Sequence, residues 1–100
     1  MTRERRFEPR HSANEPVEIS WLDQNGAVET ARGLLRDLSR SGARIQVDRA
    51  IRVGTALQIT VREYKLSARV LYCVRTPSDF LLGVELDPDS QGVVRTRQLS

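Results

Sequence analysis

The feature that most constrains the fold is a repeated alternation of apolar and polar residues in short runs, each bounded by turn-forming residues. Val17, Ile19 and Trp21 alternate with polar neighbours, and the same period recurs in later segments. A period of two places alternate side chains on opposite faces of a strand, so each run has one apolar and one polar face. We therefore expect half-buried β-strands and little helix.

The alternation predicts five or six short strands, of which the second is the least regular. They are expected over residues 17–21, 28–38, 43–47, 57–61, 66–75 and 80–86. Asn25-Gly26 is a strong hairpin signal, and Gly33 is expected to mark a bulge or a corner of a curved sheet. Evenly spaced strands in so short a chain favour an all-β antiparallel barrel or sandwich, and closure into a small barrel removes open edges.

The chain is expected to form one domain preceded by an arm. Residues 1–13 have no strand or helix periodicity, and Pro9 prevents a continuous helix there, so this arginine-rich segment is interpreted as a mobile arm. Residues 14–100 are assigned to the barrel domain. Asp89 or Ser90 is expected to cap a short C-terminal helix that extends to about Arg97.

The composition is typical of a soluble folded protein, with 39% hydrophobic and 29% charged residues. No apolar run approaches the roughly 20 residues that span a bilayer, so we expect no membrane insertion. Cys73 is the only cysteine and is interpreted as a small strand residue, which fits a cytoplasmic protein without internal disulfides. Trp21 and Phe80 are expected in the core.

The positive charge is carried almost entirely by arginine. Of the 16 basic residues, Lys65 is the only lysine, and Arg3, Arg5, Arg6 and Arg10 fall within the first ten positions. A guanidinium group can form paired hydrogen bonds with phosphate or with the O6 and N7 edge of guanine, which an ammonium group does poorly. The arm is therefore expected to meet an anionic, guanine-bearing ligand.

A second polar segment, residues 37–42, lies between two apolar-periodic runs. Asp37 and Ser39 have the same strand parity, so both are expected to project from the outer surface. The Asp37 carboxylate can accept the N1 and N2 donors of guanine, and the Ser39 hydroxyl can bind phosphate. Gly42 allows a close backbone approach or a positive φ. Arg44, with Arg40, is expected to extend the positive surface.

These two segments together resemble the PilZ domain, whose signature is RxxxR followed, after a strand pair, by (D/N)xSxxG. The resemblance extends to the last strand pair, which contains Gly83-Val84. It implies a six-stranded barrel that binds the bacterial second messenger cyclic di-GMP.

The resemblance also implies roles for individual residues. Arg6 and Arg10 would clamp guanine and phosphate, and Asp37, Ser39 and Gly42 would hold the other base. Arg5, directly before RxxxR, resembles members that bind a pair of ligands. Tyr72 occupies a place where many members carry an aromatic residue near a base, although its strand parity equally fits the core. The arm would order over the ligand and signal to an unidentified partner protein.

Other functions have less support in the sequence. There is no nucleotide-binding glycine loop and no nucleophile motif, so we expect no enzyme activity. His11 has no neighbouring His or Cys, so we expect no metal and no cofactor. The first alternative is a small-barrel binder of single-stranded nucleic acid. Such proteins stack bases on exposed aromatic residues, and few exposed aromatic residues are expected here. The second is a PilZ-like adaptor that works without ligand. Ligand stoichiometry and oligomeric state stay open.

Overall fold

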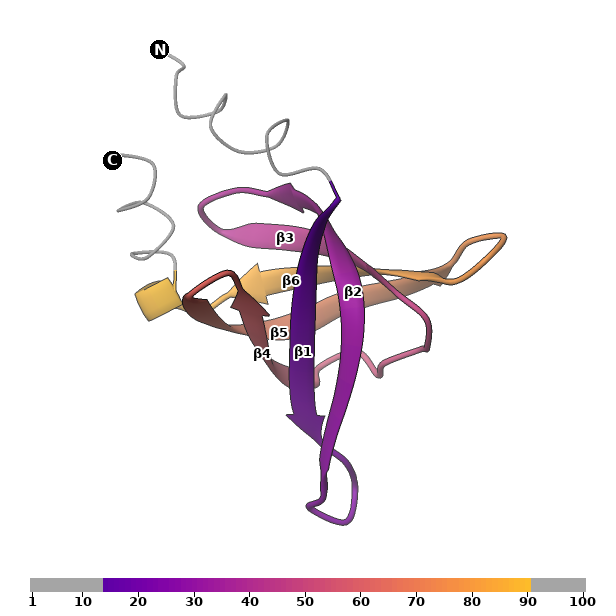
Figure 1. Ribbon diagram of the computed structural model, residues 1–100. Coiled ribbons are helices and arrows are strands. Elements are labelled where there is room, and N and C mark those ends of the chain that lie inside the picture. Colours follow the sequence, from indigo (N-terminus) through magenta and orange to yellow (C-terminus); the bar gives the residue numbers. More distant parts are fainter. Residues whose placement is uncertain (1–13, 91–100) are drawn as a thin grey trace.

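The computed structural model describes residues 14–90, and within this range the chain forms six antiparallel strands (Figure 1). Their order around the barrel is β1-β2-β3-β6-β5-β4, and β4 pairs with β1 to close it. The prediction of a small closed antiparallel barrel is confirmed. The strands are β1 (Glu15–Leu22), β2 (Val28–Leu38), β3 (Gly42–Val47), β4 (Ala56–Val61), β5 (Tyr64–Arg75) and β6 (Phe80–Leu86).

The core fills the inside of the barrel with the apolar residues of the alternating pattern. Ile19, Ile45 and Leu82 have no exposed surface, and each comes from a different strand. Burial of such aliphatic side chains is the main stabilising contribution available to a domain of this size. Trp21 and Phe80, which were expected in the core, are partly buried and pack against it.

The first hairpin confirms the turn expected around Asn25-Gly26. The Asp23 carboxylate accepts hydrogen bonds from the backbone N–H groups of Asn25 (2.8 Å) and Ala27 (2.9 Å). Gly26 has a φ of 83°, which a residue with a Cβ rarely adopts. The turn therefore depends on both the aspartate and the glycine.

Two irregularities of register shape the outer surface. The β2–β3 register shifts between Leu35 and Asp37, and the β5–β6 register shifts between Val70 and Tyr72. Gly33 was expected to mark a bulge or a corner of a curved sheet, and of these two roles the bulge is wrong, because Gly33 pairs in regular register with Val17 and Val47. A Cβ at Gly33 would lie 2.5 Å from the backbone oxygen of Gln46, so this glycine serves a close approach between β2 and β3.

The first strand begins next to the bulge in β2. Glu15 is the register partner of Leu35, and its carboxylate accepts hydrogen bonds from Arg62 Nε (2.7 Å) and Nη2 (3.1 Å) in the β4–β5 turn. This carboxylate holds the pKa of the Arg62 guanidinium above its ordinary value. The pair joins the start of β1 to the β4–β5 turn.

The chain leaves the barrel through a helical segment that begins at Pro88, directly after Asp87. Proline suits the first helical position because the N–H it lacks would have no helical partner there. The expectation that Asp89 or Ser90 caps the helix is therefore wrong. Ser90 is 5% exposed, and its Oγ accepts a hydrogen bond of 2.7 Å from the Ser67 N–H. The expected continuation to Arg97 lies outside the described residues.

Between residues 14 and 90 no helix is both long and apolar enough to cross a bilayer.

Candidate functional site

A single register row crosses the outer face of four neighbouring strands. Asp37 on β2 is paired with Arg44 on β3, Arg44 with Gly83 on β6, and Gly83 with Tyr72 on β5. The row brings together residues that are separated by up to half of the chain. It contains three of the sequence candidates, Asp37, Arg44 and Tyr72.

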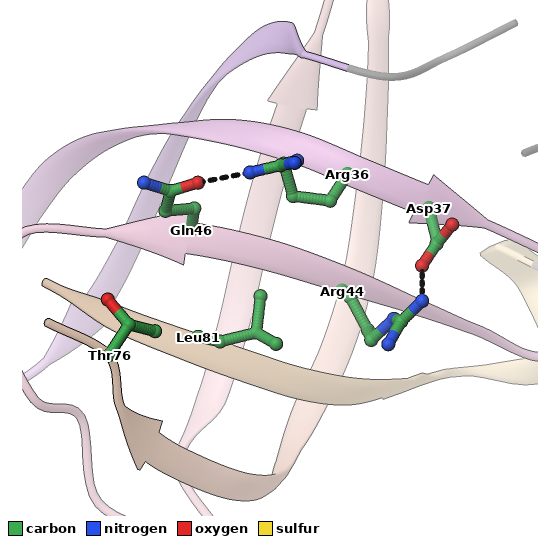
Figure 2. A pocket seen from close by; sticks show the side chains of 6 residues that line it. All are labelled: Arg36, Asp37, Arg44, Gln46, Thr76 and Leu81. Carbon is green, nitrogen blue, oxygen red and sulfur yellow. Dashed lines mark hydrogen bonds and ion pairs between the residues drawn. The ribbon is translucent and has the colours of Figure 1, made fainter. Parts of the chain in front are cut away.

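Asp37 and Arg44 form an ion pair within this row, between Oδ2 of the carboxylate and Nη2 of the guanidinium (Figure 2). Their side chains are 32% and 53% exposed. The bulge in β2 lets Arg36 and Asp37 both reach the outer surface although they are consecutive. Figure 2 shows that Arg36 extends toward Gln46, away from Asp37.

The loop from β2 to β3 is closed by Ser39 and Gly42. The Ser39 N–H donates to the Gly42 carbonyl oxygen at 2.8 Å, and Ser39 Oγ lies 3.2 Å from both the nitrogen and the oxygen of Gly42. Gly42 was expected to allow either a close backbone approach or a positive φ, and the close approach applies. A Cβ there would lie 2.8 Å from the Val84 carbonyl oxygen, whereas a positive φ is not adopted.

Tyr72 lies on the outside of the barrel, not in the core. The bulge at Leu71 reverses the inside–outside alternation of β5, so Cys73 packs against the core, and Tyr72 and Val74 are 40% and 46% exposed. The Tyr72 ring covers Gly83, where a Cβ would overlap the ring carbons. The interpretation of Tyr72 as a core residue is therefore wrong, and it is available to a ligand.

The sequence candidates that the structure describes come together around one shallow hollow of about 370 Å³. Asp37, Ser39, Gly42, Arg44 and Tyr72 all line it. The candidates Arg5, Arg6 and Arg10 lie outside the described residues. An acid, a base, a hydroxyl and an aromatic ring at one solvent-exposed hollow can together bind a flat, polar, charged molecule.

The family of the chain follows from its match to a family model. The model of the PilZ domain matches residues 4–98. The chain belongs to the PilZ domain family. The match spans the whole described barrel as well as both motif segments.

Solved structures agree with this assignment at the level of the fold. The crystal structure of YcgR in complex with c-di-GMP from Escherichia coli has a TM-score of 0.64 and 17% sequence identity, and covers 92% of this chain. This PilZ domain spans only 41% of that YcgR chain. The PilZ domain with c-di-GMP of YcgR from Escherichia coli has a TM-score of 0.62 and 16% identity, with 93% of this chain and 85% of that chain covered. No curated protein sequence matched the chain.

A second hollow of about 480 Å³ adjoins the first in this PilZ domain. It shares Asp37 and Arg44 with the first hollow and adds Arg36 and Gln46, which are not among the sequence candidates. Gln46 could have been found from the sequence, because its strand parity with Arg44 places both on one face of β3. Arg36 could not, because its position on the outer surface depends on the bulge.

Within residues 14–90 no group of three or more His, Cys, Asp or Glu side chains is arranged to hold a metal ion.

Proposed function

We propose that this PilZ domain is a receptor for cyclic di-GMP and that the first hollow is its binding site. The observation that carries the proposal is the arrangement of Asp37, Arg44 and Tyr72 in one row across the outer surface. Two structures of similar fold contain c-di-GMP, which supports the choice of ligand.

Each side chain of the hollow has chemistry that suits one part of this ligand. The Asp37 carboxylate accepts the N1–H and N2–H donors of guanine, and the Tyr72 ring offers a surface on which a base can stack. Arg44 leaves Asp37 when guanine binds there, and its guanidinium then pairs with a phosphate. Ser39 already holds the loop, so it keeps the loop backbone in place for the ligand.

The arm completes the proposed site. Arg6 and Arg10 supply the guanidinium groups for guanine and phosphate, and Arg5 favours a bound pair of ligands. A site within reach of the arm is supported by the position of Glu15, where β1 begins, because Glu15 is paired with Leu35, only two residues before Asp37. An arm that orders over the ligand gives up conformational entropy, so we expect a binding free energy of roughly −8 to −10 kcal/mol.

The output of the receptor is proposed to be a changed surface that a partner protein recognises. On this proposal the protein acts in the cytoplasm as an adaptor without enzyme activity and without a metal or cofactor. Ligand binding shifts the population of the arm, and the partner distinguishes the two states.

The test is isothermal titration of the purified chain with cyclic di-GMP, with GMP and a short single-stranded RNA as controls. Saturable binding of the cyclic dinucleotide alone is the expected result, and the molar ratio separates one ligand from a pair. Binding of RNA alone would favour the nucleic-acid binder instead. If none of the three binds, the adaptor that works without ligand becomes the better description.

A further inference from the structure

A chain of four polar residues leads to the second hollow and ends at Arg36. The Arg36 Nη1 donates to the side-chain oxygen of Gln46, and Gln46 Nε2 donates to Asp79 Oδ2 at 2.8 Å. The other carboxylate oxygen of Asp79 accepts a hydrogen bond of 2.9 Å from the Thr76 hydroxyl. The Asp79 N–H in turn donates to the Thr76 oxygen at 3.0 Å. These four side chains are called the Arg36 relay below.

The relay determines which end of the Gln46 amide faces Arg36. Because the carboxylate of Asp79 can only accept, it takes the amide NH₂ group, and the amide oxygen must then point to Arg36. The Asp79 carboxylate is fixed in turn by Thr76 at the β5–β6 turn. Arg36 is therefore held in one orientation although it lies on the surface.

Within residues 14–90 the Arg36 guanidinium has no carboxylate in direct contact, because Gln46 stands between it and the Asp79 carboxylate. Its partner Gln46 is neutral, whereas the other arginine of the hollow, Arg44, is paired with the Asp37 carboxylate. Within residues 14–90 the Arg36 guanidinium donates to no other side chain. A guanidinium held in place, with donors left over, is suited to bind an anion.

We propose that the second hollow is a subsite for a phosphoryl group. Arg36 contacts this group, and Gln46 holds the Arg36 guanidinium in position for the contact. The two hollows share Asp37 and Arg44, so a nucleotide bound in the first hollow can reach the second. In this form the inference rests on the proposed function. A phosphate group of the cyclic dinucleotide and a separate phosphate present the same oxyanion chemistry, and the experiment distinguishes them.

The experiment compares four forms of the full chain: wild type, Arg36→Gln, Gln46→Leu and the double variant. Arg32→Gln is the matched control, because Arg32 is an exposed arginine of the same strand that lines neither hollow. Each form is titrated with cyclic di-GMP, GMP and inorganic phosphate. Calorimetry gives the affinity, and the ¹⁵N-labelled chain gives the Nε–H signal of Arg36, assigned by its loss in Arg36→Gln.

For Arg36→Gln we expect cyclic di-GMP affinity to fall at least about tenfold, since hydrogen bonds to charged groups are among the stronger ones. Arg32→Gln should stay within about twofold of wild type, as expected for an exposed charge away from the site. Gln46→Leu should weaken binding and shift the Arg36 Nε–H signal in the free protein. If Gln46 acts through Arg36, the double variant binds no more weakly than Arg36→Gln alone.

The outcomes separate this inference from the proposed function. If wild type binds cyclic di-GMP and Arg36→Gln binds it equally well, the subsite is overturned and the receptor stands. If cyclic di-GMP does not bind but GMP or phosphate moves the Arg36 signal saturably, the receptor is overturned and the subsite stands. If calorimetry shows no binding of cyclic di-GMP and no titrant moves the Arg36 signal, both are overturned. Equal response to GMP and to inorganic phosphate identifies a separate phosphate as the occupant.

Discussion

Asp37 and Arg44 face each other across β2 and β3, and their side chains form an ion pair on the outer surface of the barrel. Because both side chains are partly exposed, the pair contributes less than about 1 kcal/mol to stability. A guanine that binds the Asp37 carboxylate must displace Arg44, and a pair this weak can be exchanged for a ligand. On the proposed function, the ion pair holds both groups at the hollow until the ligand displaces Arg44.

Asp37→Asn is expected to weaken cyclic di-GMP binding at least about tenfold. Asparagine keeps the size of the side chain, but its NH₂ group would face the donors of guanine, and one acceptor is lost. The free energy of unfolding should change by less than about 1 kcal/mol, because only a surface ion pair is removed. Calorimetric titration and urea unfolding measure the two quantities.

The matched control for this change is Asp48→Asn. Asp48 is an exposed acid that pairs with its neighbour Arg49 and lines neither hollow. It should leave affinity unchanged. An Asp37→Asn variant that binds as tightly as wild type would show that Asp37 does not hold guanine.

Gly42→Ala is expected to destabilise the barrel itself, by roughly 1–3 kcal/mol. The added Cβ would lie 2.8 Å from the Val84 carbonyl oxygen, so β3 and β6 would have to move apart. Urea unfolding measures this, with Ser41→Ala in the same loop as the control. A Gly42→Ala variant as stable as the control would contradict the close approach. Lost ligand binding in Gly42→Ala would therefore not identify Gly42 as a ligand contact.

Ser90→Ala is expected to lower the free energy of unfolding by roughly 1–3 kcal/mol, the cost of leaving a buried donor unpaired. The Ser90 hydroxyl is the hydrogen-bond acceptor for the Ser67 N–H, at a position that is 5% exposed. Ser78→Ala, in the exposed β5–β6 turn, is the control for removing a hydroxyl. Equal thermal unfolding of the two variants would show that Ser90 does not attach the helical segment to β5.

The regular strands could be predicted from sequence because their alternation is also their burial pattern. Ala43, Ile45 and Val47 were assigned to one face of a strand, and all three are buried in β3. A half-buried strand has a period of two wherever its pairing is regular, so local sequence is sufficient. Asp37 and Ser39 both line the first hollow, but Ser39 follows the end of β2 and lies in the loop, where strand parity does not apply.

The bulges could not be predicted, because they depend on the partner strand. From Leu66 to Val74 the alternation looks continuous, yet an extra residue at Leu71 turns Tyr72 and Val74 outward. The bulge in β2 likewise places Arg36 beside Asp37 on the surface. A bulge changes which residues face each other across two strands, and this information is not contained in either strand alone.

The contact between Tyr72 and Gly83 gives a test of the bulge in β5. Gly83→Ala is expected to cost roughly 1–2 kcal/mol, because the Cβ would overlap the Tyr72 ring. In a Tyr72→Ala background the same change should cost less than about 0.5 kcal/mol, since no ring remains and alanine restricts the unfolded chain. Urea unfolding of the four proteins gives the coupling energy, which should exceed about 0.5 kcal/mol for residues in contact. Additive effects would mean that the ring does not lie over Gly83, and the outward placement of Tyr72 beside the hollow would lose its support.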